Sequence, residues 1–188
     1  MFKMENGILY KDQKPVFCVG LSYYPSFHPA KVPVPVDGDR MGEMKKDLRL
    51  MKEAGFNLVR TAALGSVKLV NDEVKFDVSF IDSMLEEAEK LDISTMVRLQ
   101  GYSMNLRGHK DFLMLDENGK EMDTSIWSDF IQNSLYHKGI LYDNDKGTYV
   151  LAKHFSKYKN MVSYQIYNEP HYPKKYVFDY HPDTIEAY

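Results

Sequence analysis

Apolar residues recur at helical spacing in several segments of the chain. The clearest segment lies between Asp39 and Gly55, and its apolar stripe comprises Met41, Met44, Leu48 and Met51. Spacings of three and four residues place these side chains on one face of a helix. Asp39 is a suitable N-cap, and Gly55 suits the left-handed position that ends a helix. The pattern therefore predicts an amphipathic helix between these two residues.

Two further segments, with the start of another, predict helices on the same grounds. Residues 76–93 carry one apolar face, made of Ile81, Met84, Leu85, Ala88 and Leu91. Residues 148–158 predict a third helix, and residues 181–188 predict the start of a fourth, for which Asp183 is a suitable cap. An amphipathic helix packs its apolar side against another layer, so these helices should cover a sheet.

Short apolar runs between the helices predict buried strands. They cover residues 16–21, 56–64, 93–101 and 161–168. Nearly continuous apolar runs of this length are typical of parallel strands covered on both faces. Because strands and helices alternate along the chain, right-handed crossovers should join the strands in parallel.

The alternation predicts an α/β fold, and two architectures fit it. One is a TIM (β/α)8 barrel, of which only about the first four β/α units are present, and the other is an open doubly wound sheet. The strand-to-helix turns contain neither G-x-G-x-x-G nor G-x-x-x-x-G-K-[ST], which disfavours nucleotide binding. Both architectures place sites at the carboxyl ends of strands, and the polar residues found there include Tyr24, Arg60, Tyr102, Asn168 and Glu169.

Two segments fall outside this alternation. Residues 7–15 predict a short strand and turn, which could form a lid over one end of the domain. Residues 101–147 are rich in Gly, Asn, Asp and Lys and predict a long βα loop insertion. A connection of that length exceeds the usual two to six residues by far, so it is either functional or disordered.

Composition excludes several classes of protein. A length of 188 residues suits one domain or a piece of a larger one, and a net charge of -3 gives no basic surface for nucleic acid. The chain has neither a signal-peptide core nor a segment apolar enough to cross a membrane, so we expect a soluble, cytoplasmic protein. The single cysteine, Cys18, excludes an internal disulfide and is expected to be a buried structural thiol.

The run that ends in Asn168, Glu169 and Pro170 has the strongest candidate chemistry. If Glu169 faces the axis of a barrel, strand alternation directs the side chains of Ser163, Gln165 and Tyr167 the same way. Pro170 keeps the preceding residue extended, as a strand end requires.

A carboxylic acid at such a position can act as a general acid when its pKa is raised toward neutrality. In retaining glycoside hydrolysis it works with a second carboxylate about 5–5.5 Å away, which attacks the anomeric carbon. The alternative is a structural glutamate at a strand end, paired with Arg60 or Arg98.

Several motifs together resemble the clan A glycoside hydrolases, and most closely the N-terminal half of the family 42 β-galactosidase barrel. "YQIYNEPHY" resembles the Asn-Glu-Pro signature of the fourth strand, and "GLSYYPS" is similar to the first strand. "DLRLMKEAGFNLVR" is similar to the first helix and second strand of the family. The resemblance continues through "VKFDVSFIDSMLEEAEKLDI" and "MLDENGKEM", and it covers most of the chain.

The resemblance implies a role for each matching residue. Glu169 would be the acid/base, Asn168 would hold the sugar 2-hydroxyl, and Arg60 would lie beside the nucleophile and keep it ionised. Tyr24, Tyr102 and His171 are candidates for contact with the sugar.

The sequence also departs from the family pattern. After the second strand, "ALGSVKLVNDEV" replaces an aromatic-Trp pair and a Glu-Pro. The cysteine cluster near the fourth strand is absent, and the histidines lack the spacing of metal ligands. We therefore expect neither a metal nor another cofactor.

The resemblance predicts that residues 1–188 are the N-terminal half of a (β/α)8 catalytic domain, a fragment whose nucleophile lies on a later strand. The chain alone should then be inactive, and the complete protein should be a retaining, β-galactosidase-like glycoside hydrolase with a carbohydrate substrate. Formation of a homo-oligomer is compatible with this sequence. The alternatives are a carbohydrate-binding or scaffolding half-barrel without catalysis, and an unrelated α/β enzyme with an open sheet.

Overall fold

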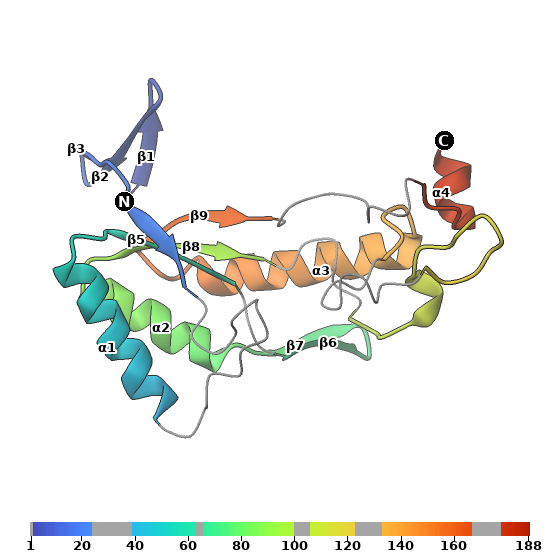
Figure 1. Cartoon of the computed structure of the whole chain (residues 1–188), viewed down its shortest axis with the longest axis horizontal. Coiled ribbons are helices and arrows are strands. Elements are labelled where there is room, and N and C mark those ends of the chain that lie inside the picture. Colours follow the sequence, from blue (N-terminus) through green and yellow to red (C-terminus); the bar gives the residue numbers. More distant parts are fainter. Residues whose placement is uncertain (1, 24–38, 63–65, 100–105, 123–132, 167–177) are drawn as a thin grey trace. The chain divides into compact units, whose positions relative to one another are not determined.

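The structure is a computed structural model that describes most of the chain (Figure 1). The described residues are 2–23, 39–62, 66–99, 106–122, 133–166 and 178–188. They form two compact units. The sheet unit consists of Met1–Gly65, Val78–Arg98 and Ala152–Gln165. The loop unit consists of Ser66–Asp77, Leu99–Leu151 and Ile166–Tyr188.

The centre of the sheet unit is a four-stranded parallel sheet. Its strands are β4 (Gly20–Ser22), β5 (Leu58–Ala62), β8 (Ser94–Arg98) and β9 (Met161–Gln165). They lie in the order β4-β5-β8-β9, which is also their order along the chain. A doubly wound sheet reverses strand order at a switch point, and no such reversal occurs among these strands. The predicted parallel strands are confirmed, in the order of a partial α/β barrel.

Two amphipathic helices lie along one face of these strands (Figure 1). They are α1 (Arg40–Glu53) and α2 (Ser79–Lys90). The Asp39 side chain accepts a 2.9 Å hydrogen bond from the amide of Gly42, and Gly55 has a φ of 88°, so both predicted ends of α1 are confirmed. The centre of each apolar stripe is buried, and the fully enclosed side chains include Met44, Leu48, Ile81, Met84 and Leu85.

The first strand is shorter than the sequence predicts. Strand β4 begins at Gly20, and the preceding residues, including Phe17 (85% exposed), lie outside the sheet. The side chain of Asn57 fixes this segment instead: its Nδ2 donates to the Phe17 carbonyl, and its Oδ1 accepts from the Val19 amide, both at 2.8 Å. The predicted burial of Cys18 is wrong for the same reason, because its thiol is only partly covered.

The amino-terminal residues form a meander of three antiparallel strands, where the sequence predicted a strand and a turn. The strands are β1 (Phe2–Glu5), β2 (Ile8–Lys11) and β3 (Lys14–Pro15). An ion pair between Lys11 and Asp92 fixes the meander to the turn before β8. The meander is thus held near the amino end of that strand, whereas the polar residues of interest follow the carboxyl ends.

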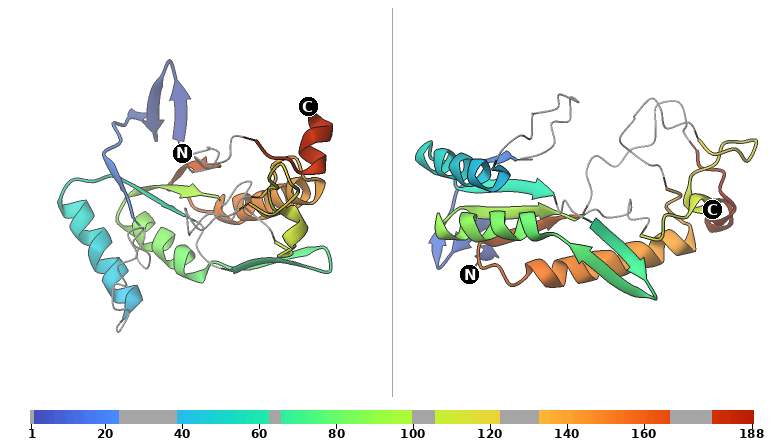
Figure 2. Two further views of the ribbon diagram at one scale, coloured as in Figure 1. Left: turned by 45° about the vertical axis from the view of Figure 1, so that its right-hand side comes forward. Right: turned by 90° about the horizontal axis from the view of Figure 1, so that it is seen from below.

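The loop unit contains a β-hairpin that the sequence analysis missed. Its strands are β6 (Ser66–Val70) and β7 (Glu73–Asp77), seen as a two-stranded ribbon in Figure 2. Asn71 and Asp72 have φ values of 50° and 63°, as a type I′ turn requires. A signal was present, because the flanking apolar residues alternate with polar ones on both sides of Asn-Asp.

Helix α3 (Lys138–Phe155) begins much earlier than the predicted start at residue 148. The segment "YDNDKG" was interpreted as loop because of its composition, but buried Ile140 and Asp143 hold it in a helix. The loop unit also contains a 3-10 turn, η2 (Lys110–Phe112), and a short helix, α4 (Pro182–Ala187). The cap of α4 is His181 rather than Asp183, because Pro182 already occupies the first helical position.

Candidate active site

Arg60 lies in the middle of β5, and side chains at the carboxyl ends of two other strands, β4 and β9, hold its guanidinium group. Its Nε donates a 2.5 Å hydrogen bond to Oε1 of Gln165 on β9, and its Nη1 donates a 2.8 Å hydrogen bond to Oγ of Ser22 on β4. The strand register places Ser22 directly beside Arg60. Three strands thus orient one guanidinium group on one face of the sheet.

The opposite face of β9 packs toward the helices. The Tyr164 hydroxyl donates a 2.9 Å hydrogen bond to the carbonyl of Ala152 on α3, and burial raises the pKa of Tyr164. Since side chains alternate along a strand, Gln165 points away from α3 and toward Arg60. Gln165 and Tyr164 therefore lie on opposite faces of β9, while the predicted shared direction of Gln165 and Glu169 stays a prediction.

Tyr23 follows β4 and has a structural role. Its hydroxyl donates a 2.6 Å hydrogen bond to Oδ2 of Asp47 on α1. Burial, followed by the hydrogen bond to this carboxylate, raises the pKa of Tyr23 well above its ordinary value. The phenol therefore stays protonated and ties the end of β4 to the helix layer.

Of the residues predicted for the site, Arg60 lies within the described part of the chain. Glu169, Asn168, Tyr24, Tyr102 and His171 lie outside the described residues, so their roles remain predictions. The alternative, an ion pair of Glu169 with Arg60 or Arg98, also involves Glu169 and therefore lies outside the described residues.

Sequence reasoning did not assign Gln165 or Ser22 to the site, although both contact Arg60. A signal existed in the alternation of side chains. Gln165 lies four residues before Glu169 and Ser22 two residues before Tyr24, so in an extended strand each has the same orientation as a predicted site residue.

The described residues contain neither a cluster of metal ligands nor a helix that could cross a membrane. Within those residues, no group of three or more His, Cys, Asp or Glu side chains is arranged to hold a metal ion. Among the described helices, none combines the length and apolar character needed to span a bilayer.

The fold is similar to that of a known glycosidase. The chain superposes on the crystal structure of the endo-1,4-β-mannanase from Rhizomucor miehei with a TM-score of 0.56 and 13% sequence identity. The match covers 90% of this chain and 48% of the mannanase, so the chain spans about half the length of that structure. The similarity shows the fold, a partial α/β barrel.

Sequence comparison gives the family. Among curated proteins, none matches the chain significantly. The model of glycoside hydrolase family 42, described as β-galactosidase, matches residues 35–188. That range includes α1, every described strand of the sheet after β4, and the Asn-Glu-Pro segment. The chain therefore belongs to glycoside hydrolase family 42.

Proposed function

We propose that this chain provides the acid/base half of a retaining glycoside hydrolase that cleaves β-linked sugars, with β-galactosides as its first candidate substrates. Membership of family 42 supports the reaction class. The described sheet supplies four strands, and the proposal assigns the nucleophilic carboxylate to a later strand of the complete barrel.

The orientation of Arg60 is the observation that carries this proposal. A guanidinium group fixed by Ser22 and Gln165 is a fixed positive charge at the carboxyl edge of the sheet. Gln165 is the last residue of β9, and Asn168 and Glu169 follow it shortly afterwards in the sequence. A cation at this edge would lower the pKa of a neighbouring carboxylate and keep a nucleophile ionised.

The proposed reaction has two steps. First, the nucleophile attacks the anomeric carbon while the carboxylic acid of Glu169 gives its proton to the glycosidic oxygen, and the alcohol leaves. Second, the Glu169 carboxylate takes a proton from water as the water oxygen attacks the anomeric carbon and releases the nucleophile. Two inversions leave the configuration of the sugar unchanged.

The remaining predicted residues would bind the sugar. Asn168 would hydrogen-bond the 2-hydroxyl, a contact that strengthens as positive charge develops on the ring. Tyr24 and Tyr102 would offer aromatic faces to the sugar, and His171 a polar contact beside Glu169. Each of these roles follows from position along the chain and from the family resemblance.

The test is Glu169→Gln in a protein that carries the complete barrel. Hydrolysis of an alkyl β-galactoside should fall by roughly 10²–10⁴-fold, because its poor leaving group needs a proton. With 2,4-dinitrophenyl β-galactoside the rate of the first step should fall far less, because this leaving group departs without a proton. Azide should then restore turnover of the variant and give a β-galactosyl azide. Glu186→Gln, an exposed glutamate of α4, is the matched control.

Other outcomes would decide against the proposal. An alkyl galactoside hydrolysed at the same rate by both variants would remove Glu169 from the acid role. Binding of β-galactosides without turnover by the complete protein would favour the non-catalytic half-barrel. The chain of 188 residues should show no turnover by itself, and activity abolished by Glu169→Gln in that chain would contradict the assignment of the nucleophile to a later strand.

A further inference from the structure

Two helices of the loop unit begin next to each other, and a histidine precedes each. His137 stands just before α3, and His181 is the N-cap of α4. The ring centroids are 4.8 Å apart, and the rings meet edge to face at 72°. This pair is here called the histidine clasp.

Hydrogen bonds fix the protonation state of His181. Its Nε2 lies 3.0 Å from the carbonyl oxygen of Asp111, which can only accept, so Nε2 carries the hydrogen. Its Nδ1 accepts a 3.2 Å hydrogen bond from the amide of Asp183. A proton on Nδ1 would place two donors against each other, so these contacts require the neutral ring.

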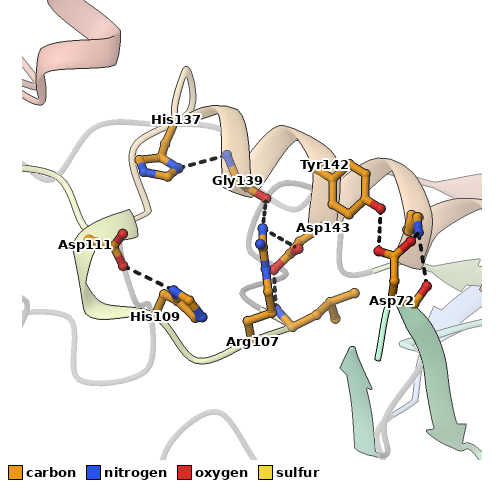
Figure 3. Close-up of polar contacts among 10 residues, drawn as sticks. Asp72, Arg107, His109, Asp111, His137, Gly139, Tyr142 and Asp143 are labelled. Carbon is orange, nitrogen blue, oxygen red and sulfur yellow. Dashed lines mark hydrogen bonds and ion pairs between the residues drawn. The ribbon is translucent and has the colours of Figure 1, made fainter. Parts of the chain in front are cut away.

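The same requirement holds for His137. Its Nδ1 accepts a 3.0 Å hydrogen bond from the amide of Gly139, as Figure 3 shows. The His137 ring is half-buried, and its centroid lies 4.3 Å from that of the Phe112 ring. Phe112 is only 3% exposed. Protonation of His137 would remove the cap acceptor and place a charge beside an apolar ring.

Several charged groups face the clasp. Asp111 lies on η2 and His109 just before it, and the Arg107 guanidinium lies 5.1 Å from the Phe112 ring centre. Lys138 and Asp183 lie in the first turns of α3 and α4. Burial, and after it His181, lowers the pKa of His137, against the opposing effect of Asp183 and Asp111. Asp183 stays ionised in mild acid, because its hydrogen bond from the Lys138 amide holds the pKa of that carboxyl low.

The clasp lies within a polar docking site for residues 179–187. Asp179 is 8% exposed, and its Oδ1 accepts from the amides of Leu115 and His181 at 3.1 and 3.0 Å. Its Oδ2 accepts a 2.7 Å hydrogen bond from Thr184, whose hydroxyl lies 2.9 Å from that of Ser134. These contacts join residues 179–187 to two segments more than forty positions earlier in the chain.

We propose that the histidine clasp makes this docking acid-labile: residues 179–187 stay docked while His137 and His181 are neutral, and they detach when the rings gain protons. The two positive charges would lie about as far apart as the ring centroids, and both helix caps would lose their acceptors. The released segment directly follows, in sequence, the residues that include Glu169.

The direction of the pH dependence follows from linkage. A histidine whose pKa is lower in the docked state takes up its proton more readily after detachment. The docking is therefore at full strength above the ordinary histidine pKa of about 6.5, and it weakens as the pH falls below that value. The lowered pKa of His137 contributes up to about tenfold per pH unit to the opening constant.

Amide exchange in the isotopically labelled 188-residue chain tests the proposal. The amides of Thr184 and Ile185 bond to the His181 carbonyl inside α4, so their protection reports docking. Relative to the amides of β5, and corrected for intrinsic exchange, their protection should fall about tenfold between pH 6.5 and 5.5. Constant protection over this range would overturn the proposal.

The double variant His137→Asn with His181→Asn separates protonation from capping. Asparagine also accepts hydrogen bonds at an N-cap but does not titrate. Protection in this variant should stay constant from pH 7.5 to 5, while His109→Asn, which alters a ring stacked on Phe112, should keep the wild-type decline. A decline that persists in the double variant would overturn the proposal.

A second measurement covers failure of the double variant to fold. Ring-carbon NMR of the unmodified chain follows each histidine directly, and His137 should gain its proton as protection of Thr184 is lost. If both rings gain protons at or above pH 6.5 while protection persists, the proposal is wrong.

Discussion

The interior of the sheet unit and the interior of the loop unit are stabilised by different kinds of interaction. In the sheet unit, buried side chains of α1, α2 and the strands are mostly apolar, with Leu48, Ile81 and Val97 among those fully enclosed. In the loop unit, buried apolar residues are interspersed with buried polar ones, such as Asp143 and Asp179. Apolar contacts tolerate small shifts, whereas a buried carboxylate requires a partner at a defined position.

This difference matches the place of each unit in the sequence. The three segments of the loop unit follow the carboxyl ends of β5, β8 and β9, where sites occur in α/β barrels. Segments of this kind can vary in sequence to suit a ligand, while the strands and helices supply a common framework. Substitutions should therefore affect the two units through different mechanisms.

Leu48→Ala should give the largest effect, because it creates a cavity in the sheet unit. Leu48 is fully buried on α1, and a leucine-to-alanine change in such a position costs about 3 kcal/mol of unfolding free energy. Leu50→Ala on the same helix is the control: Leu50 is 52% exposed, so the loss should stay below about 0.5 kcal/mol. Urea denaturation followed by circular dichroism measures both, and equal losses would contradict this account of the core.

Asp143→Asn should have the next largest effect, in the loop unit. The buried carboxylate forms a 2.9 Å ion pair with Arg107 and accepts a 3.0 Å hydrogen bond from the Leu106 amide (Figure 3). Asparagine can keep the second contact but turns an amide toward the guanidinium, at a cost of about 2 kcal/mol. Asp145→Asn, at an exposed position of the same helix, should cost little.

Amide exchange in residues 106–122 measures this change locally. Faster exchange there in Asp143→Asn, with unchanged exchange in β5, is the expected result. Equal exchange in the Asp143 and Asp145 variants would show that the buried charge does not hold the loop unit together.

The same substitution, threonine to valine, should have opposite signs in the two units. The Thr184 hydroxyl in the loop unit bonds to Asp179 and Ser134, so Thr184→Val leaves a buried carboxylate oxygen without its donor and costs about 1–2 kcal/mol. Thr61 in the sheet unit is buried, and among the described residues its Oγ1 has no hydrogen-bond partner. Thr61→Val should therefore raise the unfolding free energy, by about 1 kcal/mol at most.

Thermal and urea denaturation of the two variants check these signs. A loss of stability in Thr61→Val would mean that its hydroxyl has a partner in the folded protein. A neutral Thr184→Val would mean that the hydroxyl network contributes nothing to the docking of α4.

The sheet unit was largely predictable from sequence because burial leaves a periodic pattern. Met44 and Leu48 recur at helical spacing, and Val59 lies in a continuous apolar run, so these helices and strands could be assigned from the sequence. The exception is β4, which begins later than predicted. Strand β4 begins late because the side chain of Asn57 holds Phe17 and Val19 outside the sheet. A contact between residues so far apart in the sequence leaves no periodic pattern.

The loop unit was much less predictable. Helix α3 extends through a polar segment because the buried Asp143 forms an ion pair with Arg107. The sequence does not reveal this pairing, because the two residues are far apart along the chain. The candidate site shows both situations: Arg60 was identified from its place in the second predicted strand, whereas its contacts with Gln165 and Ser22 depend on strand register. Register between distant strands could not be deduced from the sequence of either strand alone.

The smallest predicted effect concerns an exposed contact between the hairpin and α3. Asp72 at the hairpin turn pairs with Lys146 at 2.6 Å and accepts a hydrogen bond from the Tyr142 hydroxyl (Figure 3). Lys146, and after it Tyr142, holds the pKa of the Asp72 carboxyl below its usual range. The contact therefore stabilises the ionised form above the ordinary carboxyl pKa and is lost as the pH falls through the lowered value.

Lys146→Gln should move the pKa of Asp72 upward, toward that of a free aspartate, because it removes the largest cause of the shift. Lys68→Gln, at an exposed lysine of the same hairpin, should leave it almost unchanged. NMR titration of the Asp72 carboxyl carbon measures both variants, and added salt should reduce the difference between them, since exposed pairs are screened. An unchanged pKa in Lys146→Gln would assign the shift to the Tyr142 hydrogen bond, and the loop unit would then depend on its polar contacts more than on its surface charges.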